Sequence, residues 1–180
     1  FHAGDSLTMQ ATVRLAKQHG VAVGAHPGWP DLQGFGRREM SLSPEETEAL
    51  VLYQIGALAA FAKAEGVELR HVKPHGALYN QSARDRRLAE AVARAVKHFS
   101  RDIVLVGLAG SRSVEAAQEM GLCVLNEGFP DRGYTSEGTL IPRGQPGAIL
   151  ASVEEVAAHA GDLAANGIQF GGRRVQVDTL

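Results

Sequence analysis

The sequence predicts a protein of the α/β class with a parallel β-sheet. Short apolar segments alternate with longer segments that carry helix signals, and the clearest strand is IVLVGL at residues 103–108. Strands that alternate with helices of roughly 10–20 residues are typical of βαβ units, in which consecutive strands run parallel. The length of 180 residues suffices for one domain with its own core. We therefore expect a single β/α domain over residues 1–180.

The first part of the chain contains two predicted helices, each followed by a strand. Asp5 can cap the first helix, and Gly20 stands where a helix commonly ends. Ser43 and Glu46 form a capping box around Pro44 at the start of the second helix. The predicted elements are, in order, a helix over residues 5–19, a strand over 21–25, a helix over 43–65 and a strand over 69–72.

The remaining part continues the alternation and closes with a hairpin. Ser111 can cap a short helix, and Ser152 with Glu155 makes a second capping box. Gly171 and Gly172 provide the turn of the hairpin. The predicted elements are a helix over residues 84–98, strands over 103–108 and 122–125 separated by a helix over 111–121, a helix from 152 that ends before 167, and hairpin strands over 168–170 and 175–177.

Two long loops and four polar clusters follow predicted strands. The loops cover residues 27–42 and 128–148, and loops longer than about 12 residues in a compact domain are usually functional. Each cluster places a titratable group beside glycine or proline, and the four lie at residues 2–5, 25–28, 72–76 and 126–132. The strand that should precede the first cluster would lie before residue 1. Since the carboxyl ends of parallel strands share one edge, which carries the active site in barrels, we expect the clusters to meet in one site.

Three histidines at equivalent strand-end positions, His2, His26 and His75, are the first candidates for catalysis. A single loop histidine is more often a structural residue, but three coincidences of position favour a shared site. The other histidines lie in or at the ends of helices or inside a strand, where packing explains them: His19, His71, His98 and His159.

Charged and aromatic residues in and beside the clusters complete the candidate set. Lys73 is either a solvated loop residue or a cation that stabilises an oxyanion. Arg37 and Arg38 are either solvated or clamp a carboxylate through two hydrogen bonds. Glu127 acts as an acid or base, orients a histidine, or caps loop backbone. The candidates for contact with a substrate also include Asp5, Tyr79, Asp131 and Arg132.

Composition and missing motifs exclude several classes of function. A net charge of −2 argues against nucleic-acid binding, and no run approaches the roughly 18 apolar residues of a membrane span. The single Cys123 and the lack of a signal-peptide pattern favour the cytoplasm. The dinucleotide, P-loop, HExxH, CxxC and GxSxG motifs do not occur. Water activated by histidine or carboxylate, with or without a divalent metal, is the chemistry that remains.

Several stretches resemble the LamB/YcsF family in order along essentially the whole chain. They are FHAGD at residues 1–5, GAHPGWPDLQGFGRR at 24–38, YQIGAL at 53–58, HVKPHGALYN at 71–80, GLAGS at 107–111 and DRGY at 131–134. The resemblance implies a seven-stranded β/α barrel similar to the sugar deacetylases. It also implies a hydrolase subunit that cleaves the cyclic amide of 5-oxoproline to L-glutamate, coupled to ATP hydrolysis, in a complex with two partner subunits.

The resemblance also indicates what this chain lacks. Family members usually open with a motif resembling DLNCDLGE on the first strand and extend to a His-Gly-Asp motif beyond the segment at 177–179. Neither motif occurs here. We therefore expect the barrel to lack its first strand and the chain to be truncated at both ends. Association with further copies of the chain is left open.

The hypothesis for the mechanism assigns each role to a side chain. His26 or His75 activates water, Lys73 stabilises the oxyanion, and Arg37 or Arg38 holds the substrate carboxylate. Two other functions stay open at this point. One is a metal-dependent deacetylase of N-acetylated sugars or small amides, and the other is a non-catalytic subunit that presents substrate to its partners.

Overall fold

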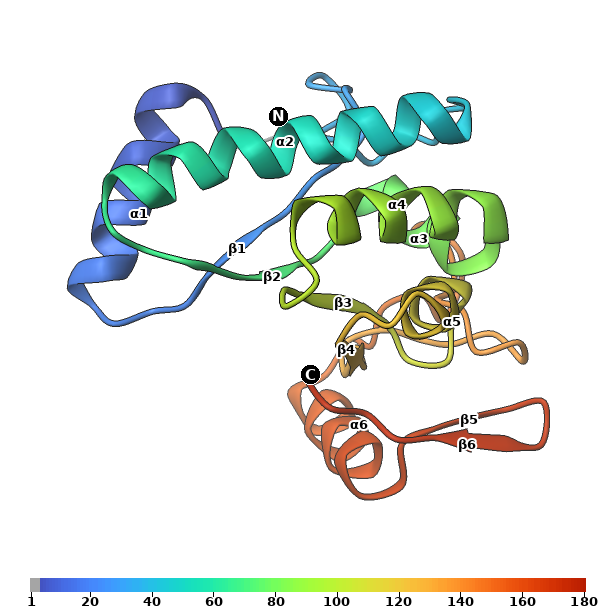
Figure 1. Cartoon of the computed structure of the whole chain (residues 1–180). Helices are drawn as coiled ribbons and strands as arrows, with labels where there is room; N and C mark the ends of the chain where they lie inside the picture. The colour runs from blue at the N-terminus through green and yellow to red at the C-terminus, as the bar shows by residue number, and fades with distance from the viewer. Residues whose placement is uncertain (1–3) are drawn as a thin grey trace.

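The computed structural model describes residues 4–180, in which six helices and six strands alternate along the chain (Figure 1). The elements are α1 (Ser6–Gln18), β1 (Val23–Ala25), α2 (Pro44–Ala64), β2 (Leu69–Val72), α3 (Gly76–Arg84), α4 (Arg86–Phe99), β3 (Val104–Leu108), α5 (Arg112–Glu119), β4 (Val124–Glu127), α6 (Val153–Asn166), β5 (Ile168–Phe170) and β6 (Arg173–Val175). No helix in this part of the chain is both long and apolar enough to cross a lipid bilayer.

Four strands form a parallel sheet in the order β1-β2-β3-β4, with consecutive strands as neighbours. An isolated parallel bridge between Glu127 and Thr179 places the end of the chain beside β4. The predicted α/β class and the parallel sheet are therefore confirmed, as part of a β/α barrel. The expected total of seven strands stays a prediction, because the described residues supply four strands of this sheet.

The main core lies between the sheet and the helices that cover one of its faces, α2, α4 and α5 (Figure 1). Val72 of β2 and Leu105 of β3 are fully buried against Val51 and Ile55 of α2 and the alanine-rich face of α4. A smaller cluster joins α6 to the hairpin through Leu163 and Ile168. The opposite face of the sheet carries His71 and Lys73, which alternate with Val72 along the chain.

Local signals determine most element boundaries. Asp5 caps α1, and both predicted capping boxes are present, at Ser43 and Ser152. Ser111 precedes α5 as expected, but its hydroxyl makes no capping hydrogen bond. The predicted strand over residues 69–72 is confirmed without a shift, and the others differ by one to three residues at an end.

Two parts of the expected fold were wrong in detail. Helix α3 was not expected, because the KPHG sequence before it is typical of a loop; Gly76 starts the helix with a φ of +56°, which glycine tolerates. The second hairpin strand is Arg173–Val175 rather than 175–177. Gly171 and Gly172 both have positive φ and form a two-residue turn that pairs Phe170 with Arg173. Residues 177–179 instead run beside β4.

Candidate active site

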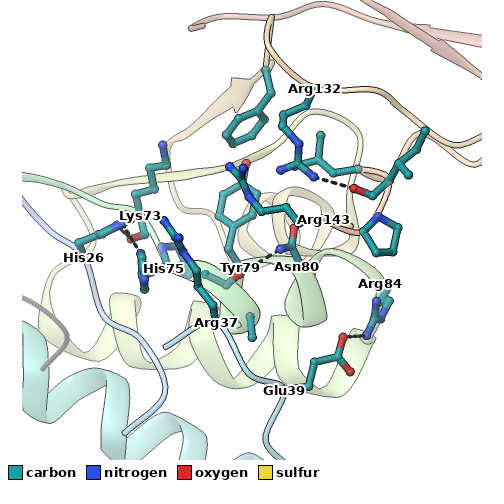
Figure 2. A pocket seen from close by; sticks show the side chains of 17 residues that line it. His26, Arg37, Glu39, Lys73, His75, Tyr79, Asn80, Arg84, Arg132 and Arg143 are labelled. Carbon is teal, nitrogen blue, oxygen red and sulfur yellow. Dashed lines mark hydrogen bonds and ion pairs between the residues drawn. The ribbon is translucent and has the colours of Figure 1, made fainter. Parts of the chain in front are cut away.

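A cavity of about 500 Å³ opens at the carboxyl ends of β1 and β2. Its walls come from these strand ends, from α3 and from the two long loops before α2 and α6 (Figure 2). Lys73, His26 and His75 gather on one side, and Arg84 and Glu39 lie on the other, with Tyr79, Arg37 and Arg143 between them. The expected convergence of the strand-end clusters is thus observed for the clusters after β1, β2 and β4.

His26 and His75 contact each other and are each held by a backbone carbonyl. His26 Nε2 lies 3.0 Å from His75 Nδ1, and the rings meet edge to face at a centroid distance of 4.8 Å. His26 Nδ1 lies 2.5 Å from the carbonyl oxygen of Lys73, and His75 Nε2 lies 2.8 Å from that of Phe35. A carbonyl only accepts hydrogen bonds, so these two nitrogens are the N–H donors.

Partial loss of water contact makes both rings harder to protonate. The edge of the His26 side chain is exposed to the cavity, yet its nitrogens face a carbonyl and a second ring, and desolvation lowers its pKa to about 4. Desolvation also lowers the pKa of His75, and the nearby Arg37 acts in the same direction. At neutral pH both side chains are therefore uncharged and able to accept a proton.

Lys73 forms an ion pair with Glu127 across 54 residues of sequence. The Glu127 side chain is only 8% exposed, and its second carboxylate oxygen accepts a hydrogen bond of 2.9 Å from the Tyr79 hydroxyl. Burial and the neighbouring Glu127 carboxylate raise the pKa of Tyr79 well above its usual value. Glu127 therefore positions the Lys73 ammonium beside the cavity, which favours the orienting role among those predicted for it.

Arg37 and Arg38 have different environments although they are adjacent. Arg37 lines the cavity, and its guanidinium lies 5.3 Å from the centroid of the Phe35 ring. Arg38 instead pairs with Asp31 inside the same loop, with its Nε 2.9 Å from Asp31 Oδ2. The hydrogen bonds from Arg38 lower the pKa of Asp31 to about 2. This division favours Arg37 as the residue that faces a ligand and Arg38 as a support of the loop.

The loop before α2 is anchored to the helices on both sides. Gln54 of α2 accepts a hydrogen bond from the Gly28 amide and donates one to the Gly28 carbonyl. The fully buried Trp29 donates through Nε1 to Gln81 of α3 at 2.6 Å. Trp29 was predicted to form an apolar wall or ordinary packing, and packing is what the structure shows.

Arg132 anchors the second long loop, between β4 and α6. Its Nε donates to the Ala148 carbonyl at 2.8 Å and its Nη2 donates to the Ile141 carbonyl at 2.6 Å (Figure 2). The side chain is almost entirely buried, which lowers the pKa of its guanidinium. Arg132 thus holds the segment that brings Arg143 to the cavity wall.

The remaining sequence candidates lie elsewhere. Both carboxylate oxygens of Asp5 are used in capping α1, where they accept hydrogen bonds from Leu7 and Thr8. Asp131 is not among the residues that line the cavity. His2 lies outside the described residues. The roles predicted for these three side chains stay predictions.

Four polar residues of the cavity wall were not singled out from the sequence: Glu39, Asn80, Arg84 and Arg143. Arg143 lies in a loop that length alone marked as functional, so it could have been included. Asn80 follows Gly76 by one helical turn, but the helix itself was not predicted. Arg84 pairs with Glu39 across the far end of the cavity, a contact between distant segments that carries no local signal.

The histidine pair does not present a ready metal site. Within residues 4–180, no three His, Cys, Asp or Glu side chains are placed to hold one ion together. His26 and His75 direct a nitrogen at each other and their other nitrogens at carbonyls. In this arrangement the two rings would have to turn before they could share a metal ion.

Acidification above pH 5 should lower the free energy of unfolding. Desolvation lowers the pKa of His26 from 6.5 to about 4, and lowers those of His71 and His75. Between these values the unfolded chain binds more protons than the folded protein, so stability is lost as the pH falls from 6.5. The ion pair of Asp31 adds nothing in this range, because its stabilisation is lost only below 3.8. Urea denaturation at pH 7.5, 6.0 and 5.0 measures the trend, and a free energy that is constant or rises on acidification contradicts it.

The fold and the site define a β/α protein with polar side chains gathered at the carboxyl ends of parallel strands. The chain belongs to the LamB/YcsF family, whose model matches residues 1–179. The resemblance predicted from the sequence motifs is therefore confirmed.

Proteins named as subunits of 5-oxoprolinase are the similar relatives. The protein of Pyrococcus horikoshii is 58% identical over 157 residues, which are 87% of this chain and 62% of the relative. That of Thermococcus onnurineus is 60% identical over 157 residues, with the same coverage. That of Symbiobacterium thermophilum is 58% identical over 167 residues, or 93% of this chain and 64% of the relative. The chain thus spans less than two thirds of the length of these relatives.

A solved structure shares the fold over the whole chain. The crystal structure of the lactam utilization protein from Thermus thermophilus matches with a TM-score of 0.89 and 52% sequence identity. The match covers 100% of this chain and 74% of the other. The partial barrel described above is therefore the fold of a protein whose name refers to lactams.

Proposed function

We propose that this chain is the catalytic part of a hydrolase that opens the cyclic amide of 5-oxoproline to give L-glutamate. The observation that carries the proposal is a single cavity that holds two uncharged imidazoles, a lysine ammonium and an arginine. The relatives named as subunits of 5-oxoprolinase, together with the lactam utilization protein, support the choice of substrate.

The three groups match the requirements of amide hydrolysis. Water must lose a proton as it attacks the carbonyl carbon, and an uncharged imidazole accepts it. The carbonyl oxygen gains negative charge, which the Lys73 ammonium stabilises. Arg37 has the geometry to bind the carboxylate of 5-oxoproline at the cavity wall. The ion pair with Glu127 fixes the ammonium before the substrate arrives, so little reorganisation is needed in the transition state.

We further propose that ring opening is coupled to ATP hydrolysis in a complex with two other subunits in the cytoplasm. A five-membered lactam is a stable amide, so ATP hydrolysis would supply the driving force. The relatives carry the word subunit in their names, which supports the existence of partners. The exposed, unpaired thiol of Cys123 fits a reducing compartment.

Glutamate release from 5-oxoproline by the intact protein tests the proposal. We expect release with ATP and the partner subunits, and a large loss when any of these is omitted. Loss of release in a His26→Asn, His75→Asn double variant would place the chemistry in this cavity. Wild-type release by that variant would overturn the catalytic role in favour of substrate presentation. Acetate release from N-acetylated sugars without ATP, together with inactivity on 5-oxoproline, would replace the proposal by a deacetylase.

Arg37→Met and Arg38→Met should affect different properties. Loss of Arg37 removes a cation from the cavity, so we expect KM for 5-oxoproline to rise about tenfold or more with little change in stability. Loss of Arg38 leaves the almost buried Asp31 carboxylate without its partner, so we expect a free energy of unfolding lower by about 1–3 kcal/mol. Kinetics and urea denaturation of both variants measure the difference. Equal effects of the two substitutions on KM would contradict the assignment.

A further inference from the structure

The contact between His26 and His75 has one proton fewer than it has hydrogen bonds when both rings are neutral. The bonds to the carbonyls of Lys73 and Phe35 require N–H groups at His26 Nδ1 and His75 Nε2. A neutral imidazole carries only one N–H, so the two facing nitrogens then carry only lone pairs. These nitrogens are 3.0 Å apart, a hydrogen-bond distance that needs one proton between them.

We propose that His26 and His75 act as one acid–base unit, which binds a single proton between His26 Nε2 and His75 Nδ1 and serves as the general base of the hydrolysis. The catalytic half of this inference rests on the proposed function, whereas the shared proton does not. With the extra proton, all three hydrogen bonds are satisfied at once. Without it, two lone pairs oppose each other, which makes the pair more basic than either ring alone would be in the same surroundings.

The charges around the pair limit it to one proton. Lys73 and His71 face His26, and Arg37 and Lys73 face His75. The carboxylate on this side, Glu127, is already paired with Lys73. A second proton would place two imidazolium groups in contact beside these cations. Desolvation lowers the pKa of each ring, so the pair is neutral at pH 7 and ready to accept its proton.

The backbone is arranged to hold the pair in this protonation pattern. Phe35 has a φ of +55°, a conformation that non-glycine residues seldom adopt. In this conformation its carbonyl oxygen reaches His75 Nε2, and the next carbonyl, of Gly36, accepts a hydrogen bond of 2.9 Å from the Ala77 amide. Strain of this kind persists where the surrounding structure supports it, often at functional sites. The loop therefore fixes the tautomer of His75 as the strand end fixes that of His26.

The proton returns to the substrate within one turnover. Both rings line the cavity, so a water molecule there can pass its proton into the gap while its oxygen bonds to the lactam carbon. The carbon–nitrogen bond then breaks, and the pair gives the proton to the departing nitrogen. The new carboxyl group loses its remaining proton to the amine through solvent. Water thus supplies the oxygen and both protons, and the pair is regenerated.

Nitrogen-15 NMR of the histidine rings between pH 8 and 4 tests the shared proton without substrate. In the wild-type protein we expect the signals of His26 and His75 to change together, with one midpoint and a total uptake of one proton. In His75→Phe the midpoint of His26 should fall by about one pH unit or more, because its proton loses the second acceptor. His71→Asn removes a nearby imidazole outside the pair and should leave the common midpoint unchanged.

Separate midpoints in the wild-type protein, or a His26 midpoint that is unchanged in His75→Phe, would overturn the proposal. The wild-type titration decides the matter even if His75→Phe fails to fold. In turnover, the acid limb of kcat/KM should follow the common midpoint and shift with it in His75→Phe. Coupled rings in a protein that releases no glutamate would refute the proposed function alone. Glutamate release with independent rings would refute the shared proton alone.

Discussion

Replacement of Lys73 by methionine should lower the turnover of the intact protein about 100-fold or more. The ammonium group borders the cavity and is held there by Glu127, and loss of one oxyanion donor typically costs about 10²–10³ in rate. Glutamate release under saturating 5-oxoproline measures the effect. Because the variant keeps the aliphatic part of the side chain, the packing against Phe129 is largely preserved.

The same substitution also affects stability, so the two effects must be separated. Glu127 keeps its hydrogen bond from Tyr79 but loses its cation, and we expect a free energy of unfolding lower by about 1–3 kcal/mol. Adding Glu127→Gln removes the buried charge and should restore stability but not turnover. Lys97→Met removes a lysine that contacts the Met120 carbonyl at the end of α5, and it should retain wild-type turnover. Near-normal turnover in Lys73→Met would end the oxyanion assignment.

Gly76→Ala should be strongly destabilising for a change of one methyl group. Residue 76 has a φ of +56°, and a Cβ atom there would lie 2.5 Å from the Gly36 carbonyl oxygen. Backbone strain costs about 1–3 kcal/mol and overpacking about 1–3 kcal/mol, so we expect a total of about 2–5 kcal/mol. For a protein of this size that corresponds to a Tm lower by roughly 5–15 °C.

Two matched glycines separate the causes. Gly121 has a φ of +77° with open space around its Cβ position, so Gly121→Ala reports backbone strain alone, about 1 kcal/mol. Gly56 lies inside α2 with open space, and Gly56→Ala should stabilise the protein by about 0.5–1 kcal/mol. Thermal denaturation of the three variants gives the order. A Gly76→Ala variant no less stable than Gly121→Ala would show that the loop can move away from α3 at little cost.

The sequence predicted the order of helices and strands because their signals are local. The capping boxes at Ser43 and Ser152 each need only four consecutive residues, and both are present. Helix α3 escaped prediction because its first residue depends on a backbone conformation that only the contact with Gly36 makes evident. The displaced hairpin strand has a similar origin, since the turn at Gly171 and Gly172 determines the register.

The site was predicted as a region more accurately than as a set of contacts. His26, Lys73 and His75 were expected at one edge of the sheet, because the ends of parallel strands must share it. Which of Arg37 and Arg38 faces the cavity could not be read from the sequence. The answer depends on the side of the loop on which Asp31 lies, and Asp31 takes Arg38.

The sequence by itself determined the alternation of elements, the parallel sheet and the strand-end positions of the polar residues. Only the tertiary structure decided that Lys73 pairs with Glu127 and that His26 faces His75, contacts that join residues 54 and 49 positions apart. The physical reason is the range of the interactions. Caps and apolar patterns act within a few residues, whereas the partner of a charged or polar side chain depends on how distant strands and loops pack together.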